Sequence, residues 1–148
     1  NFKKKKPSTV FLDGDGFREI INDNLGFDYQ SRKKNSERLK KMCFFLDSQE
    51  INVICSVLSI FPEDREWCRK NLSNYYEIYV KVPIKILEKR DQKNIYSKAL
   101  RGEIKNVVGV DLKFPEPKKS DLVIINSGNL EKFLKNVNKI LSLVGLKE

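Results

Sequence analysis

Short apolar runs alternate along the chain with stretches of a longer hydrophobic period. The short runs are rich in Val, Ile, Leu and Tyr and predict β-strands: STVFL at 8–12, INVICSV at 51–57, YYEIYVKV at 75–82 and DLVII at 121–125. Several of them are almost continuously apolar, which is typical of strands that are covered on both faces. The pattern therefore favours a parallel sheet buried between helices.

Helical periodicity fills the stretches between these strands. Apolar residues recur at i, i+3, i+4 and i+7 within 32–49, and the same spacing returns within 129–144 after the breaker NSGN. Strands that alternate with helices predict an α/β domain with right-handed crossovers. A chain of 148 residues, 40% of them hydrophobic, is long enough for one such domain with its own core.

One segment, 92–118, interrupts the alternation with the sequence QKNIYSKALRGEIKNVVGVDLKFPEPK. Long segments of this kind in compact α/β domains are usually lids or binding loops. A disordered loop is the alternative, but disordered segments rarely hold so many apolar residues. The apolar residues embedded here are Ile95, Tyr96, Ile104, Val107, Val108 and Phe114. We therefore expect a mobile lid.

The charge balance is basic, with 29 Lys and Arg against 20 Asp and Glu and a formal net charge of +9. A nucleic-acid interface is one interpretation. It lacks support from any RNA- or DNA-binding motif, so no nucleic-acid partner is expected. Solvated surface lysines are the favoured alternative to that interface, and cations gathered around a polyphosphate substrate fit the stretch at 11–35 better.

The cysteine and histidine content limits which residues could bind a metal or accept a proton. Cys43, Cys55 and Cys68 show no metal-binding spacing, and histidine is absent. An odd, unpatterned set of cysteines indicates reduced thiols in a cytoplasmic protein. No apolar run reaches the roughly 20 residues needed to cross a bilayer, and no signal peptide is visible. We expect a cytoplasmic protein without a membrane partner, whose proton acceptor is a carboxylate.

The first predicted strand ends at two carboxylates, in LDGDGFR at 12–18. Ligands of open parallel sheets bind at the carboxyl ends of strands, where Asp13 and Asp15 are placed. One carboxylate there can hold Mg²⁺ and a second can accept a hydroxyl proton, while Arg18 can grip a phosphate. A polar turn with an N-capping aspartate fits Asp-Gly-Asp equally well, so the tripeptide leaves both interpretations open.

The motifs that follow favour the first interpretation. LDGDGFR, LGF, SRKKN, SVLSIFPEDR, RDQKNIY and RGEIKNVVGVD occur in this order. They resemble the adenylyl-sulfate kinase family, whose patterns are roughly LDGDNxR, LGF, DRxENxRR, FISPYxxDR, RDxKGLYxKA and GEIKxFTGID. The resemblance implies a P-loop kinase fold, a parallel sheet flanked by helices with a lid, and a homodimer. It also implies transfer of the ATP γ-phosphoryl group to the ribose 3′-hydroxyl of a small nucleotide, with ATP and Mg²⁺ as cofactors.

The resemblance implies roles for individual residues. Asp13 corresponds to the metal-side aspartate, Asp15 to the base, and Phe27 to an aromatic ring that stacks on the acceptor base. The set implied to be catalytic is Asp13, Asp15, Arg18 and Lys105. Acceptor contacts are implied for Arg18, Phe27, Arg32, Asn35, Ser59, Lys105 and Val107, and ATP contacts for Arg90, Asp91 and Lys93. Taken alone, Phe27 would be an ordinary core aromatic, and Arg32 and Lys105 solvated charges.

A kinase of this family also needs the phosphate loop G-x-x-x-x-G-K-[ST], which residues 1–148 do not contain. The opening NFKKKKPSTVFL resembles the end of the family's first helix followed by its second strand. We therefore expect about 20 to 25 further residues, a central strand and this loop, ahead of Asn1. Residues 1–148 are then a single kinase domain without its first strand. A nucleotide-binding remnant without kinase activity is the alternative.

The acceptor pocket departs from the family pattern. Gly16 replaces the asparagine of DGDN, Lys34 a glutamate, Ile60 a proline, and Val107 the lid phenylalanine. A lost base–aromatic stack removes about 1–3 kcal/mol, which suits a smaller base than adenine. In the capsule-pathway branch of the family the acceptor is cytidine diphosphoramidate.

The resemblance therefore implies phosphorylation of cytidine diphosphoramidate in capsular polysaccharide biosynthesis. An adenylyl-sulfate kinase of sulfate assimilation is the first alternative. A non-catalytic basic module that binds nucleotides or RNA is an alternative of another class.

Overall fold

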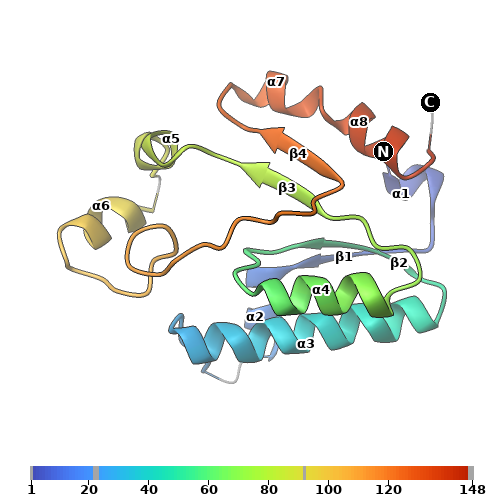
Figure 1. Cartoon of the computed structure of the whole chain (residues 1–148), viewed down its shortest axis with the longest axis horizontal. Coiled ribbons are helices and arrows are strands. Elements are labelled where there is room, and N and C mark those ends of the chain that lie inside the picture. The colour runs from blue at the N-terminus through green and yellow to red at the C-terminus, as the bar shows by residue number, and fades with distance from the viewer. Residues whose placement is uncertain (1, 22–23, 92, 147–148) are drawn as a thin grey trace.

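The computed structural model describes residues 2–21, 24–91 and 93–146. Its helices, labelled in Figure 1, are α1 Phe2–Lys5, α2 Gly14–Ile21, α3 Tyr29–Ser48, α4 Pro62–Asn71, α5 Ile84–Lys89, α6 Ile95–Leu100, α7 Leu130–Leu134 and α8 Val137–Leu143. Its strands are β1 Thr9–Asp13, β2 Asn52–Ser56, β3 Ile78–Lys81 and β4 Leu122–Ile125. The predicted strands and the α/β class are confirmed.

The strands form two parallel pairs, β1 with β2 and β3 with β4. In these pairs Asp13 lies opposite Ser56 and Lys81 opposite Ile125, so the carboxyl ends coincide. Among the described residues β2 and β3 do not pair, and Figure 1 shows the two pairs apart, with α3 and α4 beside the first and α7 and α8 beside the second. Phe11 and Ile125 are 60% and 67% exposed, so the prediction of strands covered on both faces is wrong for the described residues.

Helix α3 brings two predicted site residues onto one face. Its N-cap, Asp28, accepts hydrogen bonds from the Ser31 backbone N–H at 3.0 Å and the Ser31 hydroxyl at 2.6 Å. The cap starts the helix just after Phe27, earlier than the hydrophobic period alone predicts. Arg32 and Asn35, three positions apart, therefore project from the same side of the first turns.

The C-terminal helix predicted over 129–144 is divided into α7 and α8. The break lies at Asn136, whose Nδ2 donates to the carbonyls of Lys132 at 3.3 Å and Phe133 at 3.0 Å. An amide side chain that bonds to nearby carbonyls competes with the regular helical ladder. The period predicted the buried Leu141 correctly, but Leu130 and Leu134 of the same predicted face are 70% and 53% exposed, and it did not predict this interruption.

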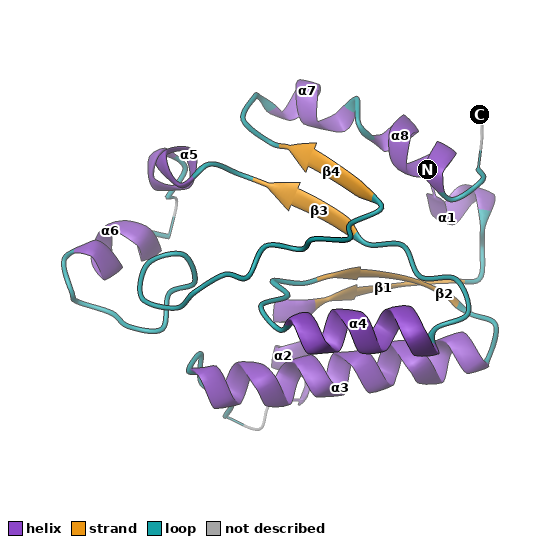
Figure 2. Cartoon of the chain, viewed as in Figure 1, coloured by secondary structure: helices purple, strands orange, loops and turns teal. Residues whose placement is uncertain are grey.

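Within the segment 92–118, residues 93–118 contain the short helix α6 and a tight turn at 106–112 and are otherwise loop (Figure 2). Residue 92 lies outside the described residues. Val108 packs into a core cluster with Ile60 and Phe61, against which Leu112 and Phe114 also pack. The segment is thus anchored by its second half, and its mobility remains a prediction.

Candidate active site

The site begins where β1 ends. Asp13 Oδ2 accepts the Gly16 N–H at 3.0 Å, so this carboxylate caps the turn into α2. Gly14 is needed between the two aspartates, because a Cβ there would lie 3.3 Å from both the Ser56 carbonyl oxygen and Val57 Cγ2. Asp15 follows Gly14 in the sequence and is exposed at the carboxyl edge of the sheet.

Two arginines hold the loop that carries Phe27. Arg18 Nη1 donates to the carbonyls of Leu25 at 3.2 Å and Gly26 at 2.6 Å, and Arg32 Nε donates to the Phe27 carbonyl at 2.7 Å. Both guanidinium groups also lie against the Phe27 ring, with Cζ at 4.9 Å and 5.5 Å from its centroid. The arginines therefore fix the position of the aromatic side chain.

The charge on these arginines suits an anionic ligand. Burial lowers the pKa of Arg32, and the neighbouring Arg18 charge lowers it further, while Asp15 favours the charged form. Two like charges held close together are stabilised when an anion binds between them. A phosphate group is such an anion, and arginine binds it through paired N–H donors.

A small cavity brings predicted residues together. Its walls include Asp15, Arg18, Phe27, Arg32 and Asn35. Its volume is about 50 Å³, whereas ligand pockets typically measure roughly 300 Å³ or more. A nucleotide therefore enters only when the arginine side chains or the adjoining loops shift.

Asn35 is one of the residues that line this cavity, and its side-chain oxygen is buried. The residue is 5% exposed, and its Oδ1 has no hydrogen-bond partner within the described part of the chain. A buried polar atom without a partner costs stability, so it calls for a donor from a bound molecule or water. Phosphate oxygens are acceptors and cannot supply this bond, whereas amino and hydroxyl groups of a nucleotide can.

Three other residues predicted to contact the acceptor do not line this cavity in the part of the chain that the structure describes: Ser59, Lys105 and Val107. The Ser59 carbonyl accepts a hydrogen bond from Arg65 Nη1 at 2.7 Å, and Lys105 is exposed. Val107 is 7% exposed and so is buried in the turn, whereas a stacking residue must present its side chain to the base. Motif position alone could not reveal this burial.

The residues predicted on the ATP side lie elsewhere in the fold. Arg90 donates to the carbonyls of Asn126 and Gly128, and so connects the end of α5 with the loop after β4. Asp91 accepts from the Tyr96 and Ser97 N–H groups and the Ser97 hydroxyl, which caps α6. Arg90 and Asp91 line one open depression, and Lys93 is exposed.

Sequence reasoning missed two charged residues that hold loops through hydrogen bonds with backbone groups. Arg65 is 9% exposed and joins the Ser59 carbonyl to that of Pro115, at 2.7 Å and 2.9 Å. Asp111 binds two backbone N–H groups of the turn at 106–112. Both are charged residues at the ends of recognised motifs, PEDR and VGVD. Their position in these motifs is the feature of the sequence that could have indicated their roles.

Comparison with known proteins places the chain in a family. The sequence model described as adenylylsulphate kinase matches residues 1–125. The chain belongs to the adenylylsulphate kinase family. The predicted fold and enzyme class are thereby confirmed: the chain is a nucleotide kinase with a P-loop kinase fold.

Named relatives differ in their acceptor. The chain is 43% identical over 143 residues to the cytidine diphosphoramidate kinase of Campylobacter jejuni, with 95% of this chain and 83% of the relative covered. It is 39% identical over 140 residues to the adenylyl-sulfate kinase of Clostridium kluyveri, with 94% and 69% covered. The Mycobacterium tuberculosis APS kinase in complex with AMPPNP and APS superposes with a TM-score of 0.81 at 27% identity, covering 97% of this chain and 84% of that one.

No helix within the described ranges is both long and apolar enough to cross a membrane.

Proposed function

We propose that this kinase transfers the γ-phosphoryl group of ATP to the ribose 3′-hydroxyl of cytidine diphosphoramidate, in capsular polysaccharide biosynthesis. The observation that carries the proposal is the convergence of Asp15, Arg18, Phe27, Arg32 and Asn35 on one cavity. A carboxylate, two cations, an aromatic ring and a buried amide match the hydroxyl, the phosphates and the base of a nucleotide.

Catalysis rests on positioning and charge neutralisation, as in other phosphoryl transfers. Asp15 orients the 3′-hydroxyl and accepts its proton, while Arg18 and Arg32 hold the acceptor's anionic groups. Lys105 approaches the phosphates from the segment 92–118, which covers the site and excludes water that would hydrolyse ATP. ATP supplies the transferred group when it binds, with Arg90, Asp91 and Lys93 on its side of the fold.

Asp13 fits a role in holding Mg²⁺. Its carboxylate lies at the carboxyl edge of the sheet and uses Oδ2 for the turn, which leaves its other oxygen for a metal-bound water. The described residues contain no cluster of three or more metal-binding side chains. Mg²⁺ in kinases binds through one or two carboxylates, waters and substrate phosphates, so a single carboxylate is adequate.

We further propose that a fifth strand lies between β2 and β3 and leads into the phosphate-binding loop. These two strands have unpaired edges in the described structure, and Phe11 and Ile125 are largely exposed. A parallel sheet is stable when its interior strands are paired and both faces are covered. One inserted strand joins the two pairs into one sheet.

Cytidine diphosphoramidate is preferred over adenylyl sulfate for two reasons. The C. jejuni relative covers more of the chain at higher identity than the C. kluyveri relative. In addition, the lid has Val107 where the family pattern has phenylalanine, so a closed lid offers an adenine no second aromatic ring. The proposal also includes a homodimer, because of the resemblance to the family, and a cytoplasmic location, because the cysteines show no pattern of disulfide or metal binding.

The test measures ADP release by the natural full-length chain with Mg²⁺ and either acceptor. We expect kcat/KM at least about tenfold higher for cytidine diphosphoramidate, the effect of one lost stacking partner. ADP release without an acceptor should be negligible. A preference for adenylyl sulfate would overturn the acceptor assignment, and absence of turnover with either would overturn the 3′-kinase proposal.

A further inference from the structure

We propose that Asp111 is a positioning residue that shapes the turn at 106–112 and holds it against α3, and thereby sets affinity for the acceptor. The inference rests on the proposed function, since it concerns the same cavity. It assigns a role to a carboxylate that lies outside the cavity wall.

Asp111 organises the turn through backbone hydrogen bonds. Its Oδ2 accepts the Asn106 N–H and its Oδ1 the Val107 N–H, both at 2.6 Å. These bonds, the Asn106 bond above all, lower the pKa of Asp111, so it is charged at neutral pH. The Val107 carbonyl closes the turn by accepting N–H groups from Val110, Asp111 and Leu112 at 3.1–3.2 Å.

The turn contains a strained residue that this carboxylate holds in place. Asn106 has φ +67°, in the left-handed region of backbone conformation that few residues other than glycine and asparagine adopt readily. Hydrogen bonds between an ionised carboxylate and N–H groups are stronger than neutral ones. They stabilise the conformation that places the Asn106 carbonyl.

That carbonyl connects the turn to the acceptor cavity. The Asn106 oxygen accepts a hydrogen bond from Arg32 Nη2 at 3.0 Å, and Arg32 Nε donates to the Phe27 carbonyl at 2.7 Å. One guanidinium group therefore joins the segment 92–118 to the loop of the aromatic side chain. Without Asp111, Asn106 loses its fixed position, and Arg32 and Phe27 lose one of their supports.

The first experiment replaces Asp111 with asparagine in the natural chain. We expect the acceptor KM to rise about tenfold, the scale of lost hydrogen bonds to a charged group. The ATP KM should change less than about threefold, because Arg90 and Asp91 lie elsewhere in the fold. The kcat should fall by a smaller factor than the acceptor KM rises, because only the adjoining Lys105 connects the turn to the phosphates. Glu103→Gln is the control, an exposed carboxylate of the same segment paired with Arg101, and it should leave all three parameters unchanged.

A second pair of variants tests the same step through the backbone. Both bonds of Asn106 described above use its backbone atoms, so Asn106→Gly keeps them and tolerates φ +67°. Asn106→Val disfavours that conformation. We expect Asn106→Gly to keep a near-normal acceptor KM and Asn106→Val to raise it about tenfold, as Asp111→Asn does. This pair of variants tests the inference even if Asp111→Asn fails to fold.

Limited trypsin digestion gives a readout that does not depend on activity. Cleavage at Lys105 should accelerate about tenfold in Asp111→Asn and Asn106→Val, because the turn then opens more often. Unchanged acceptor KM in Asp111→Asn, or equal KM values for the two Asn106 variants, would overturn the inference. A wild-type chain without acceptor-dependent ADP release, but with these digestion differences, would overturn the proposed function and leave the positioning role standing.

Discussion

Arg18 and Arg32 divide their donors between the protein and the space in front of Phe27. An arginine side chain has five N–H donors, and Arg18 and Arg32 each use some of these donors to bind loop carbonyls. Both arginines line the cavity, together with Asp15 and Asn35. The site is therefore partly assembled before a nucleotide binds, which lowers the entropic cost of positioning it.

At this scale the sharpest prediction concerns Asp15. Asp15→Asn keeps the shape and hydrogen-bonding capacity of the side chain but removes the proton acceptor. We expect kcat to fall about 10²-fold or more, with the acceptor KM little changed. Glu19→Gln, an exposed carboxylate on the same helix, is the control and should retain full activity. Near-normal kcat in Asp15→Asn would show that Asp15 is not the base.

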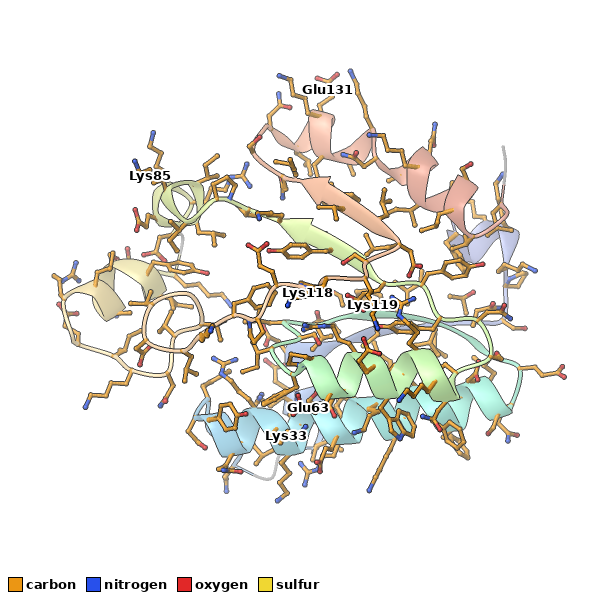
Figure 3. All side chains as sticks on the ribbon, viewed as in Figure 1. Lys33, Glu63, Lys85, Lys118, Lys119 and Glu131 are labelled. Atoms are coloured by element: carbon orange, nitrogen blue, oxygen red, sulfur yellow. The ribbon has the colours of Figure 1, made fainter. Side chains whose placement is uncertain are left out.

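Helices α3 and α4 are joined by a buried acidic residue. Asp64 is 4% exposed and accepts from Lys40 Nζ at 2.7 Å, Ser36 Oγ at 2.7 Å and Lys33 Nζ at 3.2 Å. Lys33 also pairs with the exposed Glu63 at 2.8 Å, and both side chains are labelled in Figure 3. The network fixes α4 against α3, and α4 carries Arg65, so helix packing positions the loops around the cavity.

Breaking this network should be costly. Asp64→Asn leaves two lysines with a weakened partner in a buried setting, so we expect a loss of about 3–5 kcal/mol in the free energy of unfolding. Glu63→Gln removes an exposed partner of the same lysine and should cost about 1 kcal/mol or less. Urea unfolding of the three proteins measures both. Equal losses for the two variants would contradict a buried structural role for Asp64.

The pH dependence of this network follows from the same contacts. Burial raises the pKa of Asp64, but its hydrogen bonds with Lys40, Ser36 and Lys33 outweigh burial and lower the pKa below 3.8. The carboxylate therefore contributes its full stabilisation above about pH 4, and this is lost as pH falls through the lowered pKa. The stability gap between wild type and Asp64→Asn should be constant from pH 5 to 7, in about the range where Asp is ionised, and should shrink in stronger acid.

At the scale of the whole molecule, the two strand pairs have unpaired inner edges within the described residues, and we propose that one further strand pairs them. Unpaired edges and exposed apolar faces favour association with other chains. The net charge of +9 opposes such association by repulsion and at the same time draws anionic nucleotides to the protein. If the proposed strand lies between the two pairs, its insertion completes the sheet and also positions the phosphate loop.

The inserted strand is testable by stability. A natural chain that includes the preceding segment should melt at least about 10 °C higher than residues 1–148, because the strand pairs two edges and covers apolar faces. A chain of equal length with that segment shuffled is the control and should melt like residues 1–148. If the shuffled and natural segments stabilised equally, the strand would not lie between β2 and β3.

Several features of this protein were determined by the sequence alone. Local side-chain preference and hydrophobic period favour strands in runs such as DLVII and INVICSV, and the strands lie where they were predicted. The order of the motifs fixed the family and hence the enzyme class. Asp15, Arg18, Phe27, Arg32 and Asn35 share one cavity because they flank the carboxyl edge of the sheet, as parallel topology requires.

Only the tertiary structure decided the rest, because it depends on contacts between distant segments. Arg32 and Asn106 are separated by 74 positions in the sequence, so no local signal indicates their hydrogen bond. The burial of Val107 depends on a turn closed by Asp111, and the break at Asn136 on side-chain bonds that a hydrophobic period does not register. Periodicity shows which face of an element is apolar, whereas packing determines what covers that face and which charged groups are held there.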